Sequence, residues 1–507
     1  MTSAGMETFV EIERTFELPD GIVLPDLTVP AATVVAAPLT IELVATYSDT
    51  ADFALARAHV TLRRRQGGTD GGWHLKLPAG TDQRREVHRP LGRGTTVPLP
   101  LRRAVSSLIL GAELRKVVEV RTTRTVHVLV GTDQLAVAEV CDDQVDVTRL
   151  DRPGDDPAAV QSWREVEVEL TGGDADLLER VSERLTDAGG RVADHQSKLR
   201  RALGNDLPPR HIRPEGLRRR AAGTALWDYL ALQSERLADR EVEVRLGLHD
   251  GEHQMRITAR RLRSALAVSR PLLDKDTARH LESELRWLGQ ELSEVRDLEV
   301  MRERLLEAVA AEQSPVAVRA MSTPVRSALR TDERAAMRRA REALDSRRHI
   351  ELRASLKSLL ADPPFTDKAA KGAKKVLDRR IAKTWRRFAK RVAAADEAGG
   401  TAHDEALHAV RKAAKRLRYA AEMAEPTLGK PADQLRARAQ AVQKALGNHQ
   451  DSVVAREWYE RLGREATSTA VAFGFGRLHA LEQAGASRYE EAYAAAVAEL
   501  RTVTSLR

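Results

Sequence analysis

The sequence predicts an α+β two-domain chain, with an antiparallel β domain followed by an all-α domain. Up to about residue 170, short segments alternate apolar and charged residues with the period of a β-strand. From residue 216 onward, long segments rich in Ala, Leu, Glu and Arg have helical period. Glycines and prolines interrupt regular structure in between. We therefore predict domains over residues 6–203 and 216–500, joined by a linker over residues 204–215.

The bulk composition limits the class of protein. A chain of 507 residues is too long for one hydrophobic core, which favours two or three domains. No apolar run approaches the ~20 residues of a membrane span, and the N-terminus lacks a signal pattern, so we predict a cytoplasmic protein. The single cysteine, Cys141, excludes an intramolecular disulfide and a cysteine-based zinc site.

The charge balance points to a polyanionic partner. The formal net charge is +8 and the pI is about 9.6, which favours nucleic acid, a phosphate polymer or an anionic membrane. Aromatic residues make up only 4% of the chain, whereas proteins that bind single-stranded nucleic acid stack bases on aromatic side chains. We therefore expect a phosphate polymer, and neither a membrane nor nucleic acid.

The first predicted strand, over residues 10–16, carries two carboxylates. Glu11 and Glu13 are two residues apart, so they lie on the same face of a strand. Adjacent carboxylates repel one another unless a cation lies between them, and Mg²⁺ prefers such oxygen ligands. The alternative is a surface strand whose acids are solvated.

Charged residues recur at same-face positions on the following strands. The segment over residues 60–65 is joined through a glycine-rich turn to residues 73–78, its expected hairpin partner. Further strands are predicted over residues 117–130, 135–147 and 163–170. The residues that share a face within a segment are Arg63 and Arg65, Arg84 and Glu86 in the segment after residues 73–78, Glu139 and Asp143, and Glu165, Glu167 and Glu169. Residues 73–78 also carry Lys76, and residues 117–130 carry Arg121 and Arg124.

Two arrangements can accommodate these charges. One is an open sheet with its charged face in water, and the other is a closed barrel with a charged lumen, which also removes the sheet edges. In a closed lumen, arginine and lysine side chains would bind phosphate oxygens. The carboxylates would hold metal ions that bridge a phosphoryl group and activate water.

The series of motifs resembles the CYTH domain, the triphosphate tunnel metalloenzyme family, over roughly residues 6–203. The first motif, Glu-x-Glu-x-Lys, is represented by Glu11 and Glu13. The remaining matches follow in the expected order: Tyr47-Ser48-Asp49-Thr50, Leu62 to Arg65, Trp73 with Lys76, Arg84 with Glu86, Arg124, Asp143, the strand of Glu165, Glu167 and Glu169, and Ser197-Lys198.

This resemblance implies an N-terminal antiparallel β-barrel, the triphosphate tunnel, that hydrolyses inorganic tripolyphosphate with Mg²⁺ or Mn²⁺. It implies metal ligation by four glutamates, and a metal-binding or water-orienting role for Asp143 or Glu139. Thiamine triphosphatase and adenylate cyclase activities also occur in the family and remain minor alternatives. The implied metal ligands are Glu11, Glu13, Glu167 and Glu169, and the implied phosphate-binding residues are Arg63, Arg65, Lys76, Arg84, Arg124 and Lys198.

One departure concerns the first motif, in which Thr15 stands where the family has lysine. The change removes a fixed charge, and one such donor can be worth a few kcal/mol of transition-state stabilisation. Arg14 points to the opposite face of the strand and is a poor substitute. The alternative function is therefore a non-catalytic polyphosphate-binding adaptor with a degenerate tunnel.

The junction follows the last predicted strand. Residues 174–189 predict a helix, with Asp174 as the N-cap and Gly189-Gly190 as the stop. Residues 191–203 predict a short helix or strand before the linker.

One pattern occurs twice in the all-α region. His253 is followed by cations at +3, +7 and +10, and His408, 155 residues later, is followed by the same spacing. These positions share one helix face, and related segments at residues 292–297 and 446–451 follow each copy. The repeat predicts two tandem helical bundles. A row of cations is usually a solvated face, but its recurrence favours a cationic track that suits a phosphate polymer.

This half resembles the CHAD family, the conserved-histidine α-helical domain, over roughly residues 216–500. The resemblance implies binding of inorganic polyphosphate and is compatible with association with polyphosphate granules. We expect the histidines to donate hydrogen bonds to phosphate, more strongly when protonated, and regard metal ligation by them as the weaker interpretation. The basic stretch over residues 371–391 either extends the track or is solvated. The implied residues are His253, Arg256, Arg260, Arg261, Arg263, His408, Arg411, Lys412, Lys415, Arg416 and Arg418.

Overall fold

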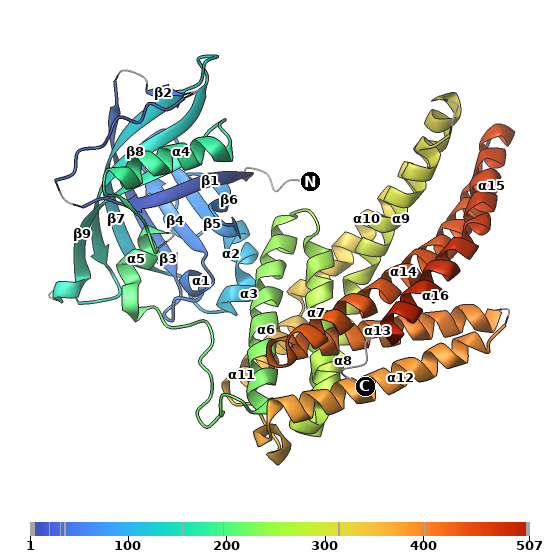
Figure 1. The fold of residues 1–507 in the computed structure, drawn as a ribbon. Coiled ribbons are helices and arrows are strands. Elements are labelled where there is room, and N and C mark those ends of the chain that lie inside the picture. The colour runs from blue at the N-terminus through green and yellow to red at the C-terminus, as the bar shows by residue number, and fades with distance from the viewer. Residues whose placement is uncertain are drawn as a thin grey trace. The chain divides into compact units, whose positions relative to one another are not determined.

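The computed structural model describes residues 6–19, 21–30, 32–34, 37–153, 156–195, 197–312, 315–399 and 401–502. The chain divides into two compact units, Met1–Arg210 and His211–Arg507, and the boundary falls within the predicted linker. The first unit contains the strands and the second is helical (Figure 1). Among the described residues, no helix combines the length and the apolar character that crossing a membrane requires.

The strands of the first unit form a closed antiparallel barrel. Eight strands follow one another in the order β1-β6-β5-β4-β3-β7-β8-β9, and pairing of β1 with β9 closes the ring. Closure removes the sheet edges and confirms the predicted barrel. The strands are β1 Glu7–Glu17, β3 Leu39–Asp49, β4 Thr61–Gln66, β5 Gly72–Gly80, β6 Gln83–Pro90, β7 Arg115–Val130, β8 Ala136–Arg149 and β9 Val160–Leu170, and the short β2 Thr33–Val34 and β10 Arg191–Val192 are added to β7 and β1.

Alternation along β1 separates the lumen from the outer core. Phe16 is buried in an apolar cluster together with residues of the helix α4, Ala175–Asp187. Arg14 also points outward, where its guanidinium lies 2.8 Å from Glu179 of α4 and 2.7 Å from Asp82. Arg14 therefore does not supply the missing lysine charge in the lumen.

The junction contains both a strand and a helix. The side chain of Asp174 accepts a hydrogen bond from the backbone N–H of Leu177, so it caps α4 as predicted. After the turn at Gly189, which has a φ of +92°, the chain forms β10 and then α5, Lys198–Leu203. The other short helices of this unit are α1 Ala54–Arg57, α2 Leu99–Ala104 and α3 Ser106–Ile109.

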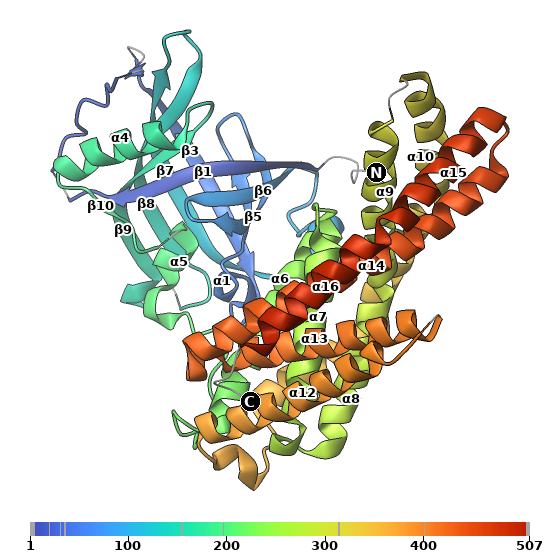
Figure 2. The same ribbon diagram turned by 45° about the vertical axis from the view of Figure 1, so that its right-hand side comes forward.

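The second unit is all-helical, but its two repeats share their hydrophobic cores. One cluster of buried residues draws on helices from Ala222 to Leu500, and a second joins α9 and α10 to α14 and α15. Figures 1 and 2 show the helices of this unit in two views. The helices are α6 Ala222–Leu246, α7 Gly251–Ser269, α8 Lys275–Glu291, α9 Ser293–Ala310, α10 Pro315–Asp345, α11 Arg347–Ala361, α12 Ala373–Asp396, α13 Thr401–Leu428, α14 Lys430–Glu465, α15 Thr469–Ala484 and α16 Ala486–Arg501.

Candidate functional sites

The barrel lumen contains a polar cavity of about 530 Å³. All eight barrel strands and α5 contribute residues to its walls, because each strand turns alternate residues inward, and every strand except β3 contributes a carboxylate, a cation or a histidine. The charged residues and histidines that line it are Glu7, Glu11, Glu13, Arg63, Arg65, Asp70, His74, Lys76, Glu86, His88, Arg124, Glu139, Glu167, Glu169 and Lys198.

Four of these carboxylates form what we call the acidic group, Glu11, Glu13, Glu139 and Glu169. The strand register places Glu169 of β9 directly opposite Glu13 of β1 on one side and Glu139 of β8 on the other. Burial raises the pKa of Glu11 to about 8. Burial also raises the pKa of Glu169, and the nearby charges of Glu13 and Glu167 add to this effect. The acidic group is thus a set of carboxylates that neighbouring strands direct into the same lumen.

Lys76 is the cation that contacts the acidic group most closely. Its Nζ lies 2.5 Å from Oε2 of Glu11, 3.2 Å from Oε2 of Glu13 and 3.3 Å from Oε2 of Glu86. Burial opposes the ammonium charge, but these carboxylates outweigh burial and raise the pKa of Lys76. Arg84 is more distant, with its Nε 3.8 Å from Oε1 of Glu13. Four carboxylates and few cations make this group suitable for a divalent metal with oxygen ligands.

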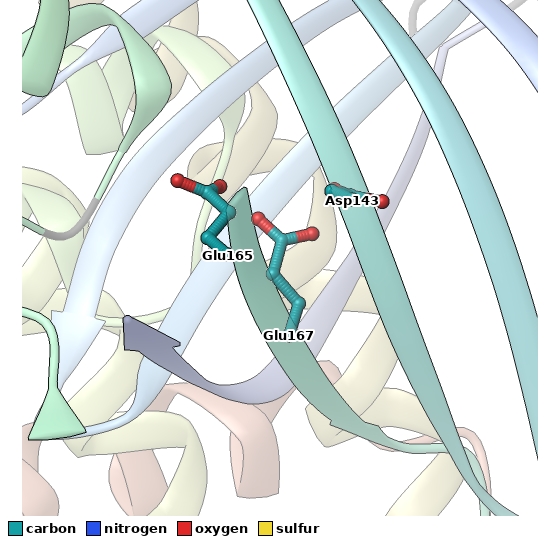
Figure 3. Close-up of side chains that lie close together, drawn as sticks. All are labelled: Asp143, Glu165 and Glu167. Carbon is teal, nitrogen blue, oxygen red and sulfur yellow. The ribbon is translucent and has the colours of Figure 1, made fainter. Parts of the chain in front are cut away.

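A second group of carboxylates lies deeper in the barrel. Oxygen atoms of Asp143, Glu165 and Glu167 lie within 4.8 Å of one another (Figure 3). The Nζ of Lys198 contacts all three, at 2.9, 2.6 and 2.7 Å respectively. Arg124 binds Asp143 through two hydrogen bonds of 2.7 Å and also contacts Glu167 at 2.5 Å.

These cations already compensate the charge of the second group. Burial disfavours the ionised form of Glu167, but Lys198 and Arg124 outweigh burial and hold its pKa well below the usual range. The ammonium of Lys198 lies at the position among three carboxylates that a metal ion would otherwise take. Glu167, which the family resemblance implies as a metal ligand, is thus paired with Lys198 and Arg124 within the second group.

The remaining predicted phosphate-binding cations also face the lumen. Arg63 lies directly opposite Tyr47 of β3 and donates a hydrogen bond of 3.4 Å to its hydroxyl. Arg65 forms an ion pair with Asp70 in the turn between β4 and β5. Burial lowers the pKa of Arg65 to about 10, and the neighbouring Arg63 and Arg124 add to this effect. Closely spaced buried cations of this kind favour a polyanionic ligand.

His74 also lines the cavity, although it belongs to none of the predicted site residues. Its Nδ1 contacts Oε1 of Glu86, and its Nε2 lies 3.0 Å from the carbonyl oxygen of Asp70. Burial lowers the pKa of His74 to about 4. The available signal was its position two residues before Lys76, on the same strand face.

One residue of the Tyr-x-Asp-Thr motif, Asp49, has a structural role. Asp49 is fully buried, and its carboxylate accepts hydrogen bonds from the backbone N–H groups of Thr50, Leu55 and Ala56 at 2.7 to 2.9 Å. Asp49 thereby fixes the turn from β3 into α1.

In the helical unit, α7 and α13 bring the two copies of the repeat together. We define the central cationic group as Arg256, Arg260, Arg411 and Lys415. Burial lowers the pKa of Lys415 to about 6, and the charges of Arg260, Arg411 and Arg256 lower it further. Burial and Arg260 lower the pKa of Arg256 as well. The two basic helix faces therefore converge on one site.

A second set of cations continues from this group. The pKa of Arg263 is lowered by burial and by Arg260, Arg286 and Arg416. Burial lowers the pKa of Arg416, and the charge of Arg387 of α12 lowers it further. A cavity of about 1160 Å³ lies there between α12, α13 and α14. Its basic lining residues are Arg387, Lys390, Arg391, His408, Lys412 and Arg416.

Two predicted polyphosphate-binding residues contact other side chains of the unit. The Nε of Arg261 lies 2.7 Å from Oε1 of Glu422, which also accepts a hydrogen bond from the hydroxyl of Tyr229. Arg418 donates a hydrogen bond of 3.1 Å to Gln443. Both side chains thus have structural contacts.

The two motif histidines lie among cations. Burial lowers the pKa of His253, and Arg296, Arg256 and Arg260 lower it further. Burial and the nearby Lys412 and Arg411 likewise lower the pKa of His408. These surroundings oppose protonation of either histidine when no anion is bound.

Comparison with known proteins identifies both units. The CYTH domain family model matches residues 10–203, and the CHAD domain family model matches residues 228–460. The uncharacterized protein Rv2226 of Mycobacterium tuberculosis is 35% identical over 510 aligned residues, which cover 97% of this chain and 96% of that protein. The chain belongs to the CYTH–CHAD family. It consists of a triphosphate tunnel domain followed by a CHAD domain.

Two solved structures are also similar to parts of this chain. PptA from Streptomyces chartreusis has a TM-score of 0.47 and 22% identity, covering 54% of this chain and 99% of that chain. The CHAD domain from the plant Ricinus communis has a TM-score of 0.44 and 26% identity, covering 57% and 94%.

The family assignment agrees with the two resemblances drawn from the motifs. CYTH enzymes are typically metal dependent, and CHAD domains are associated with polyphosphate. The roles of individual residues in this chain remain predictions.

Proposed function

We propose that the CYTH domain hydrolyses inorganic tripolyphosphate with Mg²⁺ or Mn²⁺, and that the CHAD domain binds inorganic polyphosphate. The observation that carries the proposal for the CYTH domain is the coexistence, in one cavity of about 530 Å³, of the acidic group with a wall of cations. Phosphoryl transfer requires both features, because catalysis consists largely of positioning the phosphates and neutralising their charge.

In this mechanism, Arg63, Arg65 and Arg124 bind the nonbridging phosphate oxygens and hold the chain along the lumen. We expect Lys76 and Lys198, the two lysines that line the cavity, to add positive charge to the same phosphate-binding wall. The carboxylates of the acidic group would hold the metal, with Glu139 able to orient the attacking water. A bound Mg²⁺ or Mn²⁺ supplies Lewis-acid stabilisation of phosphoryl charge and a more acidic water.

The second candidate function is the non-catalytic adaptor, which Thr15 favours. Thr15 lies directly opposite Glu167 in the β1–β9 pair, so a lysine at this position would extend into the lumen beside Glu167 and Lys198. We expect the native protein to release phosphate from tripolyphosphate when Mg²⁺ or Mn²⁺ is present, and we expect Thr15→Lys to increase kcat by roughly tenfold or more.

The measurement is phosphate release by both proteins over a range of metal concentrations. Activity of the native protein would support the hydrolase. An inactive native protein with an active Thr15→Lys variant would identify the tunnel as a binding site that has lost the motif lysine.

The CHAD proposal rests on the convergence of the two repeats at the central cationic group. Burial and neighbouring cations lower the pKa values of Arg256, Arg411 and Lys415. A flexible polyanion without bases can fill such a site, with release of its counterions. We expect Arg256→Gln together with Arg260→Gln to weaken polyphosphate binding by about 100-fold. Retention of polyphosphate by this double variant would refute the assignment.

Binding to the CHAD domain is expected to take up a proton through Lys415. The pKa of Lys415 is about 6, because burial and the charges of Arg256, Arg260 and Arg411 outweigh the attraction of Asp297. Lys415 is therefore mostly neutral at pH 7.5 without a ligand. A bound polyanion favours the ammonium form and raises this pKa. Affinity should then fall as the pH rises above 6, and binding at pH 7.5 should take up about one proton.

Calorimetry in two buffers of different ionisation enthalpy measures this uptake. The matched control is Lys415→Arg, which is charged at every pH of interest and should bind the same polyphosphate without the extra proton. Equal proton uptake by both proteins would contradict the prediction.

A further inference from the structure

The outward face of α12 carries cations that the CHAD motifs do not include. The helix has nine basic residues and two acidic ones, Asp378 and Asp396. Its inner face buries an apolar row that includes Leu377, Ile381 and Phe388. On the opposite face, basic residues recur at helical spacing over about 22 Å of helix. We call these residues the α12 stripe: Lys375, Arg379, Lys383, Arg386 and Lys390.

The α12 stripe differs from an ordinary charged surface in having no acidic partners. All five side chains are exposed, and no ion pair with a described carboxylate involves any of them. Elsewhere in the unit, exposed arginines commonly pair with acids of their own helix, as Arg347 does with Glu351 and Arg464 with Glu460. Five uncompensated cations on one face repel one another and favour an extended anion.

The α12 stripe is also continuous with the CHAD cavity. Lys390 belongs to the stripe and lines the cavity of about 1160 Å³ together with His408 and Lys412. From there, electrostatic interactions connect Arg387 to Arg416, then Arg416 to Arg263, and Arg263 to Arg260 of the central cationic group. The cations therefore form one connected path from the buried motif residues to the outer face of α12.

We propose that the α12 stripe is an external binding track for long-chain polyphosphate, which enters the CHAD cavity and continues along α12. This inference rests on the proposed binding of polyphosphate by the CHAD domain and adds a preference for chain length. A short chain fills the cavity without reaching the stripe, whereas a long chain contacts both. Trp385, the one aromatic residue of α12 besides Phe388, is half-buried and packs against Phe388, which favours a ligand without bases over nucleic acid.

The test compares two full-length variants that lose the same charge. The stripe variant is Lys375→Gln, Arg379→Gln, Lys383→Gln and Arg386→Gln, in which Lys390 is kept because it lines the cavity. The control variant is Arg326→Gln, Arg330→Gln, Arg334→Gln and Arg338→Gln, which removes four exposed arginines at i, i+4 spacing from α10. Glutamine preserves helix propensity in both variants, and circular dichroism verifies that both remain folded.

We expect the stripe variant to bind long-chain polyphosphate at least about tenfold more weakly. The slope of log Kd against log salt concentration should also fall by about 3, because four phosphate contacts are lost and each contributes about 0.7. Its affinity for short-chain polyphosphate should stay unchanged, and the control variant should match the native protein for both lengths.

Equal losses in both variants, or equal losses for both chain lengths, would overturn the proposal. If the stripe variant binds a single-stranded oligonucleotide more weakly but binds polyphosphate as the native protein does, the stripe is a nucleic-acid site and the proposal is wrong. Failure of the native protein to bind any polyphosphate would instead refute the proposed function of the CHAD domain.

Discussion

Glu11→Gln is expected to reduce metal-dependent tripolyphosphate hydrolysis by at least about 100-fold, because it removes a carboxylate from the acidic group without changing the shape of the side chain. Glutamine at this position also removes the 2.5 Å ion pair with Lys76, which leaves that ammonium shared by Glu13 and Glu86. Phosphate release at saturating Mn²⁺, together with Mn²⁺ affinity measured by electron paramagnetic resonance, checks both consequences.

The matched control for this prediction is Glu17→Gln. Glu17 lies on the same strand and the same face as Glu11, but it pairs with Arg191 at 3.2 Å and Arg201 at 3.4 Å, away from the acidic group. We expect this variant to keep native Mn²⁺ affinity. If Glu11→Gln keeps full activity and native Mn²⁺ affinity, the acidic group is not the metal site.

Lys198→Met is expected to destabilise the CYTH domain by about 3–5 kcal/mol, because it removes one partner of a buried ionic network. The lysine is 7% exposed, and its ammonium contacts Asp143, Glu165 and Glu167. Without it, Arg124 alone compensates two of the three carboxylates and Glu165 loses its closest cation. For a unit of this size, the loss corresponds to a fall in Tm of roughly 10 °C.

A double variant separates the electrostatic cause from lost packing. Lys198→Met combined with Glu165→Gln removes one uncompensated carboxylate, so we expect it to recover a substantial part of the lost stability in thermal and denaturant unfolding. If Lys198→Met is as stable as the native protein, or if the double variant is no more stable than the single one, the ionic network does not contribute the predicted free energy of unfolding.

Much of the barrel followed from strand alternation. The positions of Glu11 and Glu13, the hairpin of β4 and β5 and the outward direction of Arg14 were all predicted from the period of two. The helix after Asp174 followed from its capping residue. The choice between an open sheet and a closed barrel did not follow from these local patterns, because it depends on the pairing of β1 with β9, about 150 residues later in the chain.

The grouping of the lumen charges also required the tertiary structure. The spacing of Glu167 and Glu169 predicts that both lie on one face of β9, and the family resemblance implies that both are metal ligands. The register across β8, β9 and β1 instead joins Glu169 to Glu13 and Glu139, and α5 brings Lys198 to Glu167. Glu167 and Glu169 thus have different partners although they are two positions apart on one strand, because those partners come from other strands and from a helix.

The order of the two domains, the recurring histidine and cation spacing, and the presence of Thr15 in the first motif can all be read from the amino-acid sequence. Which charges lie next to one another depends on how the elements pack. Helix periodicity predicts that Arg260 and Lys415 each lie on a basic face, but it contains no information on whether α7 and α13 face each other. Their convergence, and the burial that lowers the pKa of Lys415 to about 6, arise from packing between segments 155 residues apart.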